Sequence, residues 1–135
     1  MGRRNNRTND GYHALPPVAE IIPPQRLEIW LAKLWLDTRR SVQGKTRPVI
    51  IISNDTSNRR SATVTVVPLT SKQKRLDLPT HVEVHWEDTQ SVALAEQIQT
   101  VDKSQLKVKL GRIENGAEVA AVERAVQEFL VLGEC

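Results

Sequence analysis

A purely aliphatic run at residues 49–52 constrains the fold more than any other segment of the chain. Pro48 precedes it and the polar residues Ser53, Asn54 and Asp55 follow it, so residues 48–53 have the length of a strand rather than of a helix. Both faces of such a strand would be apolar, which predicts a central position in a sheet. A second run, residues 63–69, alternates threonine with valine as a half-buried strand does. The middle of the chain is therefore predicted to be β-structure.

Short strands separated by polar connections dominate the rest of the chain until its last twenty residues. We expect further strands at residues 27–35, 81–86, 91–95 and 107–113, and a turn into a short helical segment at residues 100–104. Residues 37–46, 54–62 and 71–79 are polar and predict loops.

The hydrophobic period changes after Gly116, where apolar residues recur at steps of three and four. This spacing predicts an amphipathic helix of about four turns, whose apolar stripe packs against the sheet rather than binding a partner. The stripe consists of Val119, Val122, Val126, Phe129 and Leu130. A mainly β chain with one C-terminal α-helix indicates a small, strongly curved antiparallel barrel.

The length of 135 residues predicts one folded domain, over residues 26–135. Residues 1–25 contain two Pro–Pro pairs and a polar start, and are expected to form an extended or disordered N-terminal arm. The single cysteine, Cys135, rules out a disulfide framework. The sequence has no apolar run long enough to span a membrane and no signal peptide, so a cytoplasmic location is expected.

Positive charge is concentrated between residues 37 and 77, where nine basic residues stand against three acidic ones. Loops at one end of a sheet could gather these cations into a surface that binds a polyanion, although a solvated surface with scattered charge is the alternative. The candidate residues for binding a polyanion such as RNA are Arg39, Arg40, Gln43, Lys45, Arg59, Arg60, Lys72, Lys74 and Arg75.

Two of the predicted strands carry residues suited to phosphate chemistry at their ends. Arg47 precedes the first strand and Thr70 follows the second. A guanidinium can bind two phosphoryl oxygens through its planar fork, and a hydroxyl can add a third hydrogen bond. Glu96 is a third catalytic candidate, as a carboxylate base. The alternatives are a surface salt bridge for Arg47 and a turn cap for Thr70.

His81 and His85 lie on one face of a predicted strand and could serve as an acid and a base, but packing at a sheet edge is the simpler explanation. No paired-histidine or Cys-x-x-Cys pattern suggests a zinc site, and no glycine-rich phosphate loop is present. We therefore expect neither a metal nor another cofactor.

Residues 26 to about 132 resemble the MazF/PemK (Kid) family of toxin endoribonucleases. The resemblance is carried by segments in family-like order: Glu28-Ile29-Trp30, Gln43-Gly44, Arg47-Pro48-Val49, Ser53-Asn54-Asp55, Pro68-Leu69-Thr70, Pro79-Thr80-His81-Val82, Ser91-Val92-Ala93-Leu94-Ala95-Glu96-Gln97 and Thr100-Val101-Asp102. The sequence departs from the family pattern at Val42, where many members have glutamate, at Leu94, where one branch has arginine, and at Leu27, where glycine is common.

The resemblance implies a barrel like that of SH3 domains, shared with CcdB-like toxins, and a homodimer. It implies metal-independent, sequence-selective cleavage of single-stranded RNA, with Arg47 and Thr70 as catalytic residues. It also implies a cognate antitoxin whose acidic disordered segment occupies the RNA groove. The alternative is a non-catalytic toxin or binding protein on the same fold, such as a topoisomerase poison or a degenerate family member.

Overall fold

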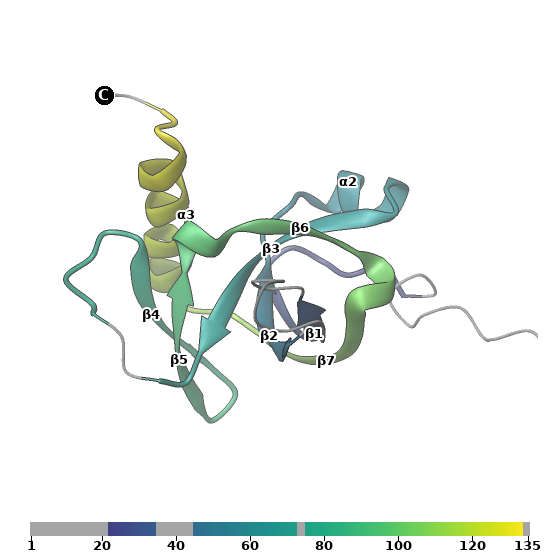
Figure 1. Ribbon diagram of the computed structural model, residues 1–135, viewed down its shortest axis with the longest axis horizontal. Helices are drawn as coiled ribbons and strands as arrows, with labels where there is room; N and C mark the ends of the chain where they lie inside the picture. The colour runs from purple at the N-terminus through teal and green to yellow at the C-terminus, as the bar shows by residue number, and fades with distance from the viewer. Residues whose placement is uncertain (1–21, 35–44, 73–74, 134–135) are drawn as a thin grey trace, which may run out of the picture.

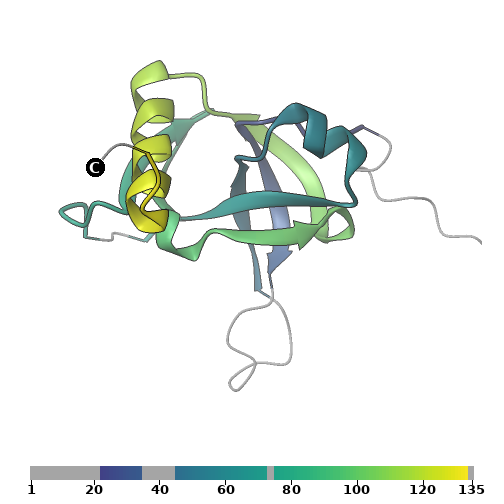
Figure 2. The ribbon, with the colours of Figure 1, turned by 90° about the horizontal axis from the view of Figure 1, so that it is seen from above.

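The computed structural model describes residues 22–34, 45–72 and 75–133. These residues form a strongly bent antiparallel sheet with a short helix, α2, on one side and a long helix, α3, on the opposite side (Figures 1 and 2). The strands of the described residues are β1 (Glu28–Leu34), β2 (Lys45–Ile51), β3 (Thr63–Thr70), β4 (His81–Trp86), β5 (Thr89–Leu94), β6 (Gln99–Asp102) and β7 (Leu106–Arg112). The helices are α2 (Asp55–Arg60) and α3 (Gly116–Leu130), with single turns η2 (Ala95–Gln97) and η3 (Lys103–Gln105).

The strands run in the order β4–β5–β3–β2–β1–β7, and β6 pairs with β3 outside this path. β3 is the branch point of the sheet, because its start pairs with β6, its middle with β2 and its last two residues with β5. The sheet curves without closing, and all of its described pairings are antiparallel. The prediction of a mainly β, curved antiparallel fold with one C-terminal helix is confirmed.

Two apolar clusters fill the core, one on each face of the central strands. Along β1, Trp30, Ala32 and Leu34 contribute to the first cluster, whereas Ile29 contributes to the second. Likewise Ile51 and Ile50 of β2 belong to different clusters. Because successive side chains of a strand point to opposite faces, a strand buried on both faces must be apolar at every position. This is why the aliphatic run became a central strand, between β1 and β3.

The long helix α3 covers the second cluster. Val122 is buried and Val119 and Val126 pack partly buried against that cluster, as the helical period predicted. The side chain of Asn115 accepts a hydrogen bond from the Glu118 amide and so caps the first turn. The last turn departs from the prediction, because Phe129 and Leu130 are each 43% exposed and are not part of the second cluster.

Three sequence-based assignments were wrong. Residues 54–62, predicted as a loop, contain α2. Asn54 is the N-cap of this helix, because its side chain accepts a hydrogen bond from the Ser57 amide. Residues 99–102 form strand β6 rather than the start of a turn, although the helical turn that follows them is present as η3. The predicted loop 37–46 and strand 48–53 are shifted, since β2 already begins at Lys45.

Residues 1–21, the larger part of the predicted N-terminal arm, lie outside the described residues. None of the helices in the described ranges is both long and apolar enough to cross a membrane.

Candidate functional site

Arg47 and Thr70 lie at the same end of the neighbouring strands β2 and β3. The ladder between these strands ends with Val49 opposite Pro68, and Arg47 and Thr70 each lie two residues beyond that pair. In an antiparallel pair, opposite residues share a face of the sheet, and so do residues two positions along each strand. Arg47 and Thr70 are therefore directed to one face at the end of this ladder. Both residues are half-buried.

The position of Arg47 differs from the prediction. It is the third residue of β2, opposite Ala32 of β1, rather than the residue before a strand. Lys45, predicted in a loop, starts β2 and lies opposite Leu34. Pairing with β1 holds the Arg47 backbone, so the guanidinium extends from a fixed base. Thr70 is the last residue of β3, as predicted.

The Thr70 hydroxyl is oriented by the chain that follows it. Its Oγ1 accepts a hydrogen bond of 3.2 Å from the backbone amide of Lys72. A hydroxyl has one donor and two acceptor positions. Since the amide occupies an acceptor position, the O–H stays available to donate to an anion. The turn cap that the sequence suggested as an alternative for Thr70 is thus present, and it is compatible with phosphate binding.

The sheet continues from Thr70 across two more strands. Thr70 pairs with Val92 of β5, and Val92 pairs with Glu83 of β4. These three residues form one row, with their side chains on one face. A pocket of about 290 Å³ lies over this row, beside Thr70. It is lined by Ser71, Lys72, Leu76, Glu83, Gln90, Ser91 and Val92.

The predicted RNA-binding cations separate into groups. Lys72 and Arg75 follow Thr70 in the chain and are exposed, although Arg75 already forms a 2.6 Å ion pair with Asp77. Arg59 and Arg60 lie in α2, before the start of β3, whereas Thr70 ends that strand. Seven residue steps of a strand span roughly 23 Å. The structure thus does not bring Arg59 and Arg60 to Thr70 within one chain, so one end of the sheet does not gather all of these cations.

Arg39, Arg40, Gln43 and Lys74 lie outside the described residues. The chain leaves the described part after Leu34 and re-enters it at Lys45, and this pair of residues is adjacent in the β1–β2 ladder. Leu34 and Lys45 therefore mark the Arg47 end of the sheet.

Glu96 has a partner of its own and is not placed beside Thr70. It follows β5 in η2, four residues after Val92, and its Oε2 lies 3.1 Å from Nε2 of His81. Burial by itself would raise the pKa of Glu96, but hydrogen bonds from its own amide, from His81 and from Thr80 hold the pKa below its usual value. A carboxylate with a lowered pKa is a weaker base, so these contacts favour a structural role for Glu96.

The ring of His81 contacts two segments of the chain. Nδ1 is 2.8 Å from the carbonyl oxygen of Arg75, and Nε2 is 3.1 Å from Oε2 of Glu96. The side chain of His81 is 9% exposed. The imidazole thus joins the segment after Thr70, through Arg75, to η2, through Glu96.

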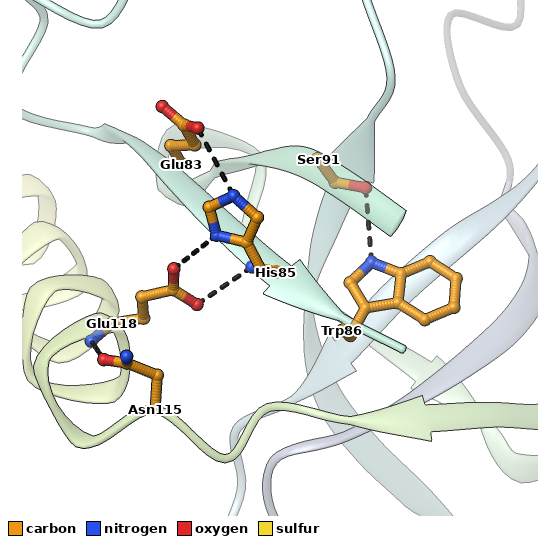
Figure 3. Close-up of polar contacts among 6 residues, drawn as sticks. All are labelled: Glu83, His85, Trp86, Ser91, Asn115 and Glu118. Atoms are coloured by element: carbon orange, nitrogen blue, oxygen red, sulfur yellow. Dashed lines mark hydrogen bonds and ion pairs between the residues drawn. The ribbon is translucent and has the colours of Figure 1, made fainter. Parts of the chain in front are cut away.

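His85 lies on the same face of the edge strand β4 but has different partners (Figure 3). Its Nδ1 is 2.6 Å from Glu118 at the start of α3, and its Nε2 is 3.5 Å from Glu83. The hydrogen bond with Glu118 raises the pKa of His85, burial opposes this effect, and the negative charges of Glu118 and Glu83 add to the increase. The sequence showed that the two histidines share a face, but it could not show that carboxylates from distant segments hold both.

The described residues contain no group of three or more histidine, cysteine, aspartate and glutamate side chains arranged to hold a metal ion. The site consists instead of a guanidinium, a hydroxyl, cations and a polar pocket at the end of two strands.

Comparison with known proteins places the chain in a family. Residues 25–130 match the family described as PemK-like, MazF-like toxin of type II toxin-antitoxin system. The chain is a member of this toxin family.

Solved structures support the same fold. The chain is 26% identical to an endoribonuclease from a mycobacterial species in complex with its cognate antitoxin, with a TM-score of 0.69, over 83% of this chain and 99% of that one. It is 24% identical to another mycobacterial endoribonuclease, with a TM-score of 0.67, over 84% of this chain and 96% of that one. MazF from Deinococcus radiodurans is 20% identical, with a TM-score of 0.67, over 82% of this chain and 98% of that one. The toxin thus shares the fold of MazF proteins.

Proposed function

We propose that this toxin is an endoribonuclease that cleaves single-stranded RNA without a metal ion. The observation that carries the proposal is the β2–β3 register, which directs Arg47 and Thr70 to one face at the end of the ladder. Family membership supports it, because the related mycobacterial structures are of endoribonucleases. A guanidinium and a free hydroxyl proton, close together, suit a phosphate whose charge grows during reaction.

In the proposed reaction the ribose 2′-oxygen attacks the adjacent phosphorus and its proton passes to water. The bond from phosphorus to the 5′-oxygen breaks, and that oxygen takes a proton from water. Arg47 binds two phosphoryl oxygens through its fork, and Thr70 donates to one of them, so both stabilise the negative charge of the transition state. This reaction assigns no step to Glu96, whose Oε2 already contacts His81.

The protein partners follow from the same assignment. We propose a homodimer, because a body of this size offers little enclosed space for several nucleotides of RNA. We also propose a cognate antitoxin with an acidic disordered segment, which would compete with RNA for the cations near Arg47 and Thr70. The complex of the related mycobacterial endoribonuclease with its antitoxin supports this partner.

The proposal is tested by incubating the purified toxin with a long single-stranded RNA in excess EDTA. Cleavage should persist and should leave a 2′,3′-cyclic phosphate and a 5′-hydroxyl, which mass spectrometry of the fragments identifies. An Arg47→Ala preparation purified in parallel controls for a contaminating ribonuclease. Activity lost in EDTA and restored by Mg²⁺ would contradict the mechanism. No cleavage under any condition would favour a non-catalytic toxin on this fold.

A further inference from the structure

The pocket beside Thr70 contains the carboxylate of Glu83. A pocket that binds only phosphate would exclude a negatively charged side chain. Glu83 is in the same row of the sheet as Thr70, separated from it by Val92. Adjacent strands are about 4.8 Å apart, so the two backbones are roughly 10 Å apart across the row. A negative charge at this distance repels a phosphate. The Glu83 carboxylate instead suits a part of the ligand, next to the phosphate, that donates hydrogen bonds.

Among the described residues, the one polar partner of the Glu83 carboxylate is Nε2 of His85, at 3.5 Å. This separation exceeds the usual length of a hydrogen bond. The short bond of His85 is the 2.6 Å contact with Glu118 (Figure 3). The Glu83 side chain is 36% exposed. Both of its oxygens can therefore accept hydrogen bonds from a ligand without breaking a strong internal bond.

The other pocket residues supply a cation, an amide and apolar surface. Lys72 is exposed and follows Thr70 by two residues, and Gln90 lies two positions from Val92, hence on its face. Leu76 is 46% exposed and gives an apolar wall. Ser91 faces the other side of β5, where its hydroxyl oxygen accepts from Trp86 (Figure 3). The pocket volume is at the lower end of the range for sites that hold small ligands, which suits one nucleobase.

We infer that this pocket binds a guanine base of the RNA next to the scissile phosphate, with Glu83 as the specificity-determining residue. This inference rests on the proposed ribonuclease function. Bases in single strands expose their Watson–Crick edges to proteins. Guanine alone presents two adjacent N–H donors there, N1–H and N2–H, which match the two oxygens of one carboxylate. Its O6 lies beside them and accepts from a lysine ammonium, the role open to Lys72.

The first experiment is a cleavage-site profile on a random-sequence RNA pool, compared between wild type and Glu83→Gln. Guanine should be enriched at one position flanking the cleaved bond for the wild type. The variant should lose about ten- to a hundredfold of this preference, because a bidentate base contact provides that much discrimination. Glu114→Gln, which removes an exposed carboxylate elsewhere in the chain, should keep the wild-type profile.

The second experiment changes the RNA instead of the protein, so it does not depend on the folding of a variant. Two oligonucleotides differ only in guanine or inosine at the preferred position; inosine lacks the N2 amino group. The wild type should cleave the inosine substrate about tenfold more slowly, the value of one hydrogen bond to a charged group. Glu83→Gln should cleave both at similar rates.

The outcomes separate the two proposals. A wild type that cleaves no RNA would refute the ribonuclease function itself. A wild type that cleaves with no guanine enrichment, or equally well at guanine and inosine, would refute the pocket assignment alone. So would a Glu83→Gln profile that keeps the guanine preference of the wild type.

Discussion

The two halves of the sheet use their residues differently. The body of the sheet, which comprises β1, β2, β6, β7 and β3 up to Pro68, surrounds the first apolar cluster. The β4–β5 hairpin, residues 81–94, is next to α3 and holds both histidines of the described residues. The pocket and the charged contacts of His81 and His85 are in or beside this hairpin. Thr70 is at the junction of the halves.

This difference suggests that stability and chemistry depend on separate residues. The central strands of the body are apolar on both faces. Their side-chain contacts therefore serve to stabilise the fold. β4 is an edge strand of the described sheet, so the hairpin can carry charged side chains there. A change in the apolar core of the body should then alter the free energy of unfolding, and a change at Arg47 or near the junction should alter activity.

The largest effect on stability is expected in the body. Trp30 is 2% exposed and its indole N–H donates to Glu28, which is also buried. Trp30→Ala should lower the free energy of unfolding by about 3–5 kcal/mol, from the cavity and from the lost hydrogen bond. Urea denaturation measures the loss. Trp86→Ala removes the same side chain from the half-buried hairpin position and should cost less; a greater cost there would contradict the division between the halves.

The next effect concerns activity, at Arg47 in β2 and at Thr70 at the junction. Arg47→Ala and Thr70→Ala should each raise the barrier to RNA cleavage by about 3–4 kcal/mol, because each removes a donor to the transition state. Arg47→Lys should restore little, since an ammonium cannot form the fork. Single-turnover rates measure the effect, and thermal melting should show a folded protein. Thr65→Ala, in the same strand but five residues from Thr70, is the control and should cleave normally. Wild-type rates in either site variant would refute the assignment.

Much of the body was predictable because its signals are local. The short aliphatic run 49–52 predicts a central strand, and the apolar residues at steps of three and four after Gly116 predict an amphipathic helix. The errors have physical causes. α2 depends on the capping bond of Asn54 and on a buried Asn58 that binds Ser53, and both override a polar composition. β6 is a strand because β3 offers it a partner, which no local pattern reveals.

The site was predictable in part for a related reason. Arg47 and Thr70 could be named because each is adjacent to an apolar strand, and their placement on one face follows from register. The pairing of Glu96 with His81 and of Glu118 with His85 joins segments 15 and 33 residues apart. Glu83 was overlooked because, in sequence, it is an ordinary polar residue of an alternating strand.

A moderate effect should distinguish the cations at the two ends of β3. Each phosphate contact on single-stranded RNA contributes roughly 0.7 to the slope of log affinity against log salt. Lys72→Ala should lower the slope by up to that amount, whereas Arg59→Ala with Arg60→Ala, in α2, should change it less. Binding of a non-cleavable 2′-deoxy oligonucleotide at several salt concentrations measures this. A larger change from the α2 pair would show that another chain brings those arginines to the RNA.

The smallest expected effect is the charge-dependent attachment of α3 to the hairpin. His85 has a raised pKa, chiefly because of its hydrogen bond with Glu118, so its charged form is favoured in the folded protein. A raised folded-state pKa gives stability that is complete below the unfolded value, about 6.5, and is lost as the pH rises through the folded value.

Glu118→Gln keeps an acceptor for the His85 amide but removes the charge. NMR titration should show a lower pKa for His85 in this variant, with a smaller decrease in Glu83→Gln because that carboxylate is 3.5 Å away. The stability difference between wild type and Glu118→Gln should also be greater at pH 6 than at pH 9. An unchanged titration of His85 would mean that solvent screens the pair and that α3 is held by its apolar contacts alone.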